Sequence, residues 1–199
     1  MRILVTGTSG DIGKAVKAAA FARSHEVVEL NRTDFEAAAA DPSGHWLLER
    51  DAGARKLDAL VFCTGTCPVR PVALTSDGLL AETVRVNCGL FLSLMRAIVA
   101  ERLYADGGMR AIAVSSVSAV EGWPGGAAYC ASKGALSSMC RAMDAELRAK
   151  RISVRAVEPR YVKTRMFDAC AGRMGVSDSE ARSPEDLAGE LVAMAEGLR

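Results

Sequence analysis

Short apolar runs alternate along the chain with longer amphipathic stretches, and this alternation predicts strands separated by helices. The expected strands are rich in β-branched and other apolar residues and lie at Ile3–Thr6, Val27–Leu30, Ala59–Phe62, Ala111–Ser115 and Ser153–Val157. The expected helices carry apolar residues at helical spacing and lie at about 11–22, 43–53, 78–104, 127–150 and 184–197. This order predicts one α/β domain over residues 1–199, a doubly wound parallel β-sheet with helices on both faces.

Two dipeptides mark the starts of expected helices. In Asp41-Pro42 and in Ser183-Pro184 a capping side chain precedes a proline at the favoured first helical position. Only about a dozen residues lead from Leu30 to the first of these starts, and a crossover with a full helix needs at least that many by itself. We therefore expect the second crossover helix to be absent or a single turn, and a third strand around Phe35–Ala40 to be short.

Composition and charge exclude several classes of protein. The chain has 199 residues and a net charge of +1, without the basic cluster that a nucleic-acid binder needs. No apolar run approaches the roughly 20 residues of a membrane helix, and Ile3–Val5 is too short for a secretory signal. We therefore expect a cytoplasmic protein with no nucleic-acid or membrane partner.

The cysteines and histidines predict no metal site. The 6 cysteines are scattered without a Cys-x-x-Cys pair, and only 2 histidines are present. A chain of this length can build a core without cross-links. We therefore expect reduced, mostly buried thiols and no bound metal.

A glycine-rich turn directly follows the first expected strand. It reads Thr6-Gly7-Thr8-Ser9-Gly10-Asp11-Ile12-Gly13 and opens an amphipathic helix. Glycines at this place permit a tight turn and a close approach of the backbone to a pyrophosphate, while the helix N-terminus offers free N–H groups to the anion. The turn predicts a Rossmann-like dinucleotide site; the alternative is that these glycines serve only the turn and its packing.

The end of the second expected strand indicates which dinucleotide binds. An acidic residue at this tip would bond the ribose 2′-hydroxyl of NAD, whereas an arginine can pair with the 2′-phosphate of NADP. The tip reads Asn31-Arg32, which favours NADP(H) over NAD(H). Glu29 argues for NAD, but we expect it inside the strand rather than at its tip. The alternative for Arg32 is a solvated loop arginine.

A serine, a tyrosine and a lysine follow the fourth expected strand. Ser116 comes at the carboxyl edge of the sheet, where open α/β sheets bind ligands. Tyr129 and Lys133 share one helix face. A lysine ammonium favours a nearby phenolate, so we expect it to lower the pKa of Tyr129 for general acid–base work while Ser116 bonds a substrate carbonyl. Taken alone, a Tyr-x-x-x-Lys pair is more often a surface helix pair.

Together these motifs resemble the short-chain dehydrogenase/reductase family over nearly the whole chain. The glycine-rich turn resembles the family's Thr-Gly-x-x-x-Gly-x-Gly motif, and Ser116 precedes Tyr129 by 13 residues, a common spacing in the family. The remaining resemblances are Ala128–Lys133 to the active-site helix, Val86-Asn87-Cys88 to the helix with the fourth catalytic residue, and Pro159–Thr164 to the Pro-Gly-x-Val-x-Thr turn.

The resemblance implies a role for each of these residues. Tyr129 would be the proton donor, and Lys133 would bind the nicotinamide ribose and tune Tyr129. Ser116 would position the carbonyl, and Asn87 would support a proton relay through water. The residues implied in cofactor binding are Gly7, Ser9, Gly10, Asp11, Ile12, Gly13, Asn31, Arg32, Cys63, Thr64, Gly65, Tyr129, Lys133, Pro159, Val162 and Thr164.

Three positions depart from the family pattern. Asp11 stands at the second glycine of the first motif, which is expected to reshape the pyrophosphate turn slightly. Phe62-Cys63-Thr64-Gly65 replaces Asn-Asn-Ala-Gly, so Cys63 and Thr64 must satisfy the local backbone in another way. Arg160 replaces a glycine and is expected either beside the cleft or in solvent.

The last third of the chain is shorter than in the family. Residues 165–183, where the family builds its substrate lid, contain two glycines and are expected to form a mobile lid. By comparison with the family, we expect its last strand to be absent after the helix 184–197. Apolar residues on more than one face of helices 78–104 and 127–150 indicate burial on two sides, and the family's four-helix interface then implies a homodimer.

The sequence therefore predicts an NADPH-dependent oxidoreductase that reduces a small ketone or other carbonyl to an alcohol, with Tyr129 as general acid. Two alternatives stay open. One is a non-enzymatic NAD(P)-sensing or partner-binding protein on the same fold. The other is epimerisation or dehydration of a nucleotide sugar, for which the short lid leaves little room.

Overall fold

The computed structural model describes residues 1–31, 34 and 56–198. Within these residues the sheet has five parallel strands in the order β2-β1-β3-β4-β5. The strands are β1 Arg2–Thr6, β2 Glu26–Leu30, β3 Ala59–Phe62, β4 Met109–Val114 and β5 Ile152–Val157. All five predicted strands are confirmed, although β4 begins two residues and ends one residue earlier than expected.

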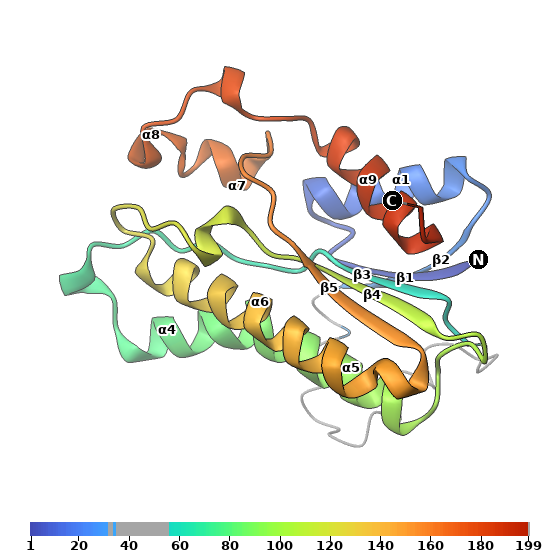
Figure 1. Ribbon diagram of the computed structural model, residues 1–199. Coiled ribbons are helices and arrows are strands. Elements are labelled where there is room, and N and C mark those ends of the chain that lie inside the picture. Colours follow the sequence, from blue (N-terminus) through green and yellow to red (C-terminus); the bar gives the residue numbers. More distant parts are fainter. Residues whose placement is uncertain (32–33, 35–55, 199) are drawn as a thin grey trace.

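Helices cover both faces of this sheet (Figure 1). The helices α1 Asp11–Ala22 and α9 Pro184–Glu196 pack together on one face. The helices α4 Asp77–Val84, α5 Leu90–Ala100 and α6 Ala127–Leu147 lie on the other. The doubly wound α/β architecture is thus confirmed, and the carboxyl ends of all its strands meet at one edge because the strands are parallel.

Successive side chains of β1 enter two different cores. Leu4 packs with α5 and α6, whereas Ile3 and Val5 pack with α1 and α9. All three are fully buried. A strand covered on both faces needs apolar residues at every position, which is why the chain shows a continuous apolar run here rather than an alternating pattern.

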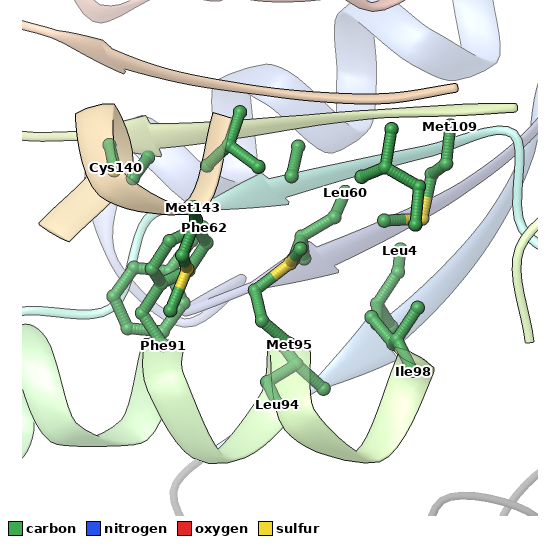
Figure 2. Packing of buried hydrophobic residues seen from close by; sticks show 14 of the residues in the cluster. Leu4, Leu60, Phe62, Phe91, Leu94, Met95, Ile98, Met109, Cys140 and Met143 are labelled. Atoms are coloured by element: carbon green, nitrogen blue, oxygen red, sulfur yellow. The ribbon is translucent and has the colours of Figure 1, made fainter. Parts of the chain in front are cut away.

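The core beneath α5 is the larger of the two. Figure 2 shows Phe91 of α5 beside Phe62 of β3, and their ring centroids are 5.3 Å apart. Leu94 and Ile98 continue the same helix face and are fully buried. Full burial of each such side chain stabilises a fold by about 1.5–3 kcal/mol, so this face fixes the position of the helix on the sheet.

The expected helix 78–104 differs from the observed one in two respects. The observed helix is interrupted by a π-helical turn at Arg85–Gly89, and it ends at Ala100. Arg102 then takes a left-handed φ of 52°, which turns the chain out of the helix. The π turn places Asn87, and such turns are frequent at functional sites because they reorient backbone groups.

The continuous helical stretch Asp77–Ala100 contains an 18-residue window with a mean hydropathy of 1.4, long and apolar enough to cross a membrane by length and composition alone. Half of that window is buried inside the protein. Its apolar residues Phe91, Leu94 and Ile98 form the core described above. Packing against the sheet therefore accounts for its apolar character.

The segment after β5 folds over the carboxyl edge of the sheet (Figure 1). It contains two short helices, α7 Arg165–Asp168 and α8 Ala171–Met174, and a single 3₁₀ turn at Asp178–Glu180. Helix α9 begins as predicted, with the Ser183 hydroxyl accepting from the backbone N–H of Asp186 at 3.0 Å. The other predicted cap Asp41-Pro42, the helix 43–53 and the strand 35–40 lie outside the described residues.

Candidate active site

The glycine-rich turn packs backbone against backbone. Gly7 has a φ of +69°, and a Cβ on it would come within 3.0 Å of Cys63 and Thr64 backbone atoms. A Cβ on Gly13 would collide with the carbonyl oxygen of Gly7. The turn therefore requires glycine at both positions, and it leaves room for a ligand at the N-terminus of α1.

A cleft of about 460 Å³ runs along this turn. Helix α1 begins at its floor, and the ends of β1 and β3 meet beside it. Its lining joins ten of the residues expected to bind the cofactor, namely Gly7, Ser9, Gly10, Asp11, Ile12, Gly13, Cys63, Thr64, Gly65 and Thr164. A groove of this size at a helix N-terminus suits an extended dinucleotide with a pyrophosphate.

After β3, the Thr6 side chain forms hydrogen bonds with the backbone, at the place where Cys63-Thr64 replaces the two asparagines of the family pattern. Its hydroxyl oxygen accepts from the backbone N–H of Cys63 at 3.1 Å and of Thr64 at 3.3 Å. The Thr64 hydroxyl donates to the same oxygen at 2.9 Å. The local backbone is therefore satisfied by a threonine of the neighbouring strand, as the Cys63-Thr64 substitution required.

The end of β2 is held by short-range hydrogen bonds. The Thr8 hydroxyl donates to Oδ1 of Asn31 at 3.0 Å, and the Asp34 carboxylate accepts from the Asn31 N–H at 2.7 Å. Glu29 lies within β2 and pairs with Lys17 of α1 at 2.6 Å, which is the main cause of its lowered pKa. Glu29 is thus turned to α1, while Arg32 lies outside the described residues.

Ser116 and Tyr129 meet at the carboxyl edge of the sheet. The Ser116 hydroxyl oxygen accepts from the backbone N–H of Ser118 at 3.1 Å and is hydrogen-bonded to the Tyr129 phenol. Burial raises the pKa of Tyr129 well above its ordinary value, and the bond to Ser116 only partly opposes this. The phenol therefore keeps its proton at neutral pH and can donate it.

Lys133 lies one helical turn beyond Tyr129 and is almost fully buried. Its ammonium donates to the carbonyl oxygen of Val114 at 2.7 Å and lies 5.8 Å from the centroid of the Tyr129 ring. Burial lowers the pKa of Lys133 to about 8. The pKa of Tyr129 is nevertheless raised and not lowered as expected, because burial of the phenol outweighs any stabilisation of the phenolate by the Lys133 ammonium.

Asn87 joins the loop after β3 to α6. Its amide nitrogen donates to the Thr66 carbonyl at 2.9 Å and to the Ser132 hydroxyl at 2.8 Å, and its oxygen accepts from the Thr66 N–H at 2.7 Å. The Ser132 hydroxyl in turn donates to the backbone carbonyl of Tyr129 at 2.7 Å. The Asn87 side chain is thus a positioning group, and its part in a proton relay stays a prediction.

A second cavity, of about 120 Å³, opens beside Ser116, Tyr129 and Lys133. Eight residues expected to contact the cofactor line it, namely Ile12, Cys63, Gly65, Tyr129, Lys133, Pro159, Val162 and Thr164. Arg160 also lines it, with a side chain that is 64% exposed and paired with Glu121 at 3.0 Å. Both sequence-based readings of Arg160 therefore hold in part, since it lies at the cavity rim and in solvent.

Four residues that line the site were not among those predicted from the sequence. Trp123, Phe167 and Cys170 line the second cavity, and Arg165 lines the first. Arg165 could have been predicted to lie at the site, because it directly follows Thr164, the last residue of the turn expected to close on the cofactor. The described residues contain no group of three His, Cys, Asp or Glu side chains able to hold a metal.

Comparisons with known proteins bear on this arrangement. The sequence model of the family described as short chain dehydrogenase matches residues 48–173. L-xylulose reductase of Bos taurus is 29% identical over 182 residues, covering 84% of this chain and 74% of that protein. The 3-oxoacyl-(acyl-carrier-protein) reductase FabG of Rickettsia felis is 31% identical over 115 residues, 58% of this chain and only 47% of that reductase.

A solved structure extends the likeness to the fold. The protein from Beutenbergia cavernae, described as an NAD(P)-dependent gluconate 5-dehydrogenase with NADP bound at low occupancy, is 27% identical with a TM-score of 0.78. The match covers 96% of this chain and 88% of that one. Motifs, sheet order and matches agree, and the chain belongs to the short chain dehydrogenase family of oxidoreductases.

Proposed function

We propose that this protein is an NADP(H)-dependent reductase that converts a small ketone or other carbonyl compound to the alcohol. The observation that carries the proposal is the meeting of Ser116, Tyr129 and Lys133 at the end of a cleft shaped for a dinucleotide. The Ser116–Tyr129 hydrogen bond and the buried ammonium beside the phenol form an acid positioned for proton donation.

The residues around the cleft fit a dinucleotide. Gly7 and Gly13 allow the tight, closely packed turn, and the N-terminus of α1 offers its N–H groups to a pyrophosphate. The nicotinamide would supply the hydride. Ser116 would hold the carbonyl oxygen, and Tyr129 would donate its proton to that oxygen. The Lys133 ammonium would then stabilise the negative charge left on the phenol.

The preference for NADP(H) rests on Asn31-Arg32 after β2. Glu29, the one acidic residue of that strand end that would favour NAD, is paired with Lys17. The guanidinium of Arg32 would pair with a 2′-phosphate. The solved relative that carries NADP is consistent with this preference.

The exposed apolar residues of α4 and α5 support a homodimer. Leu80 is 39% and Leu92 48% exposed, although the neighbouring Phe91 is fully buried. A second copy that packed α4, α5 and α6 against their equivalents would cover them. Sedimentation of the purified protein should give a dimer at micromolar concentration, and a monomer there would contradict the proposal.

Tyr129→Phe tests the function. The variant should bind NADPH with unchanged affinity, read by quenching of tryptophan fluorescence, and should lose carbonyl reduction by a factor of about 10²–10⁴, because only the proton donor is removed. Undiminished turnover in this variant would refute the role of Tyr129. Binding of NADPH by the wild type without reduction of any carbonyl would favour the non-enzymatic alternative.

A further inference from the structure

Six residues that line the second cavity carry aromatic rings or sulfur atoms, and we call them its wall. Its members are Cys67, Trp123, Tyr161, Phe167, Cys170 and Met174. They come from the loop after β3, the loop before α6 and the segment with α7 and α8. Such side chains favour apolar ligands.

Three of the polar groups in this wall have partners within the protein. The Trp123 indole N–H donates to the Ser118 hydroxyl oxygen at 3.2 Å, and the sulfur atoms of Cys67 and Cys170 lie 3.6 Å apart. Burial raises the pKa of both Cys63 and Cys67, to about 12 for Cys63, so these thiols stay neutral at physiological pH. Neither of these two thiols therefore adds a negative charge to the cavity.

The cations that line the cavity are already engaged. The Lys133 ammonium donates to the Val114 carbonyl beside Tyr129, and the Arg160 guanidinium pairs with Glu121 at the rim and lies 6.0 Å from the Tyr161 ring. Neither is placed to neutralise a carboxylate or phosphate deep in the cavity. An anionic group there would be desolvated without a partner.

From this lining we propose that the substrate is a small uncharged ketone with apolar flanking groups, rather than a sugar, a keto acid or a phosphorylated compound. This inference rests on the proposed reductase function. The cavity of about 120 Å³ is small beside the roughly 300–1,000 Å³ of sites for drug-sized ligands, which favours a substrate of about one ring or a short alkyl chain. Hydroxyls of a polyol that face the rings and sulfur atoms would lose water and gain few hydrogen-bond partners.

Two matched pairs of ketones test the proposal, with NADPH oxidation by the wild type as the signal. Cyclohexanone is compared with 4-oxocyclohexanecarboxylate, and pentan-2-one with xylulose. We expect kcat/KM to be higher for the uncharged, apolar member by about 10-fold or more in each pair. Equal or faster reduction of the carboxylate or of xylulose would overturn the inference and leave the reductase function intact.

Two variants on α8 test whether the wall of the cavity causes the preference for uncharged ketones. Met174 lines the cavity, whereas Gly172 lies two residues earlier on the same helix and has open space around its Cβ position. Met174→Arg should raise kcat/KM for 4-oxocyclohexanecarboxylate relative to cyclohexanone by about 10-fold, because it adds a cation to the wall. Gly172→Arg adds the same charge outside the cavity and should leave the ratio unchanged. An equal shift in both variants would overturn the assignment of the wall.

A binding measurement separates this inference from the function. Cyclohexanone should quench the fluorescence of Trp123 in the NADP⁺-loaded protein at concentrations where 4-oxocyclohexanecarboxylate does not, and the signal should vanish in Trp123→Phe. If neither ketone is reduced but this difference is seen, the reductase proposal fails and the apolar cavity stands. If the carboxylate binds as well as cyclohexanone, the inference about the ligand is overturned.

Discussion

The carboxylate of Asp11 holds Arg165 across the mouth of the dinucleotide cleft. It accepts from the backbone N–H of Arg165 at 2.9 Å and from its guanidinium at 3.2 Å, and the guanidinium also donates to the Ser9 carbonyl at 3.2 Å. Asp11 stands where the family has a glycine, so this link between α1 and α7 is a feature of the chain's own sequence. It places a positive charge beside the expected pyrophosphate and neutralises the carboxylate there.

Arg165→Ala should weaken the binding of NADPH. The variant removes a cation from the cleft and leaves the Asp11 carboxylate unpaired near the pyrophosphate. Since the Arg165 side chain is 74% exposed, the effect is modest, about a 5-fold rise in Kd or ~1 kcal/mol. Fluorescence titration measures it. The double variant Asp11→Asn with Arg165→Ala should recover part of the loss, and strictly additive losses would show that the two residues act independently.

Thr6→Val should destabilise the protein by about 2–4 kcal/mol, because two backbone N–H groups lose their acceptor at a fully buried position. Urea unfolding followed by circular dichroism measures the change. Thr6→Ser keeps the hydroxyl and should cost much less. A Thr6→Val protein as stable as Thr6→Ser would mean that the N–H groups of Cys63 and Thr64 find other acceptors.

The rate of carbonyl reduction should fall as the pH rises through about 8. Burial lowers the pKa of Lys133 to about 8, so its ammonium is present below that pH and is lost above it. Without that charge the phenolate formed by proton donation is less stable. The profile of kcat/KM against pH should show this limb, since it reports groups of the free enzyme. A flat profile from pH 6 to 10 would exclude Lys133 as the charge that matters.

The lowered pKa of Lys133 also predicts how this residue's contribution to the free energy of unfolding changes with pH. Its pKa is 10.5 in the ordinary state and about 8 when folded, so the unfolded chain binds more protons between these values. This group therefore makes the free energy of unfolding increase as the pH rises from about 8 to 10.5. The raised pKa values of Tyr129 and of buried thiols such as Cys63 act in the opposite direction, so the Lys133 contribution is read as a difference. Between pH 8 and 10.5 the free energy of unfolding of the wild type, measured with urea, should increase relative to that of Lys133→Met.

Arg32→Ala should abolish the preference between the two cofactors. Loss of a guanidinium that pairs with the 2′-phosphate should raise Kd for NADPH by about 10-fold and leave Kd for NADH unchanged. Parallel titrations of wild type and variant measure both constants. If NADH binds the wild type as tightly as NADPH does, the interpretation of Asn31-Arg32 is wrong.

Local pattern was enough to predict the strands, most helix starts and the grouping of the site. The apolar runs, the glycine turn and the cap at Ser183 depend on interactions between residues close in the chain, so short segments are enough to predict them. The break at Arg85–Gly89 could not be predicted in this way, because a π turn in a helix is held by contacts with other elements. Asn87 makes such contacts, to Thr66 and Ser132.

Patterns along the chain were sufficient to predict the α/β fold and to propose the glycine-rich turn, Ser116, Tyr129 and Lys133 as parts of a site. Only the tertiary structure decided the electrostatics and the lining of the site, because both depend on burial and on residues distant in the chain. Burial raised the pKa of Tyr129 although sequence proximity to Lys133 predicted the opposite. In the same way, folding brought Arg165 to Asp11 across 154 residues.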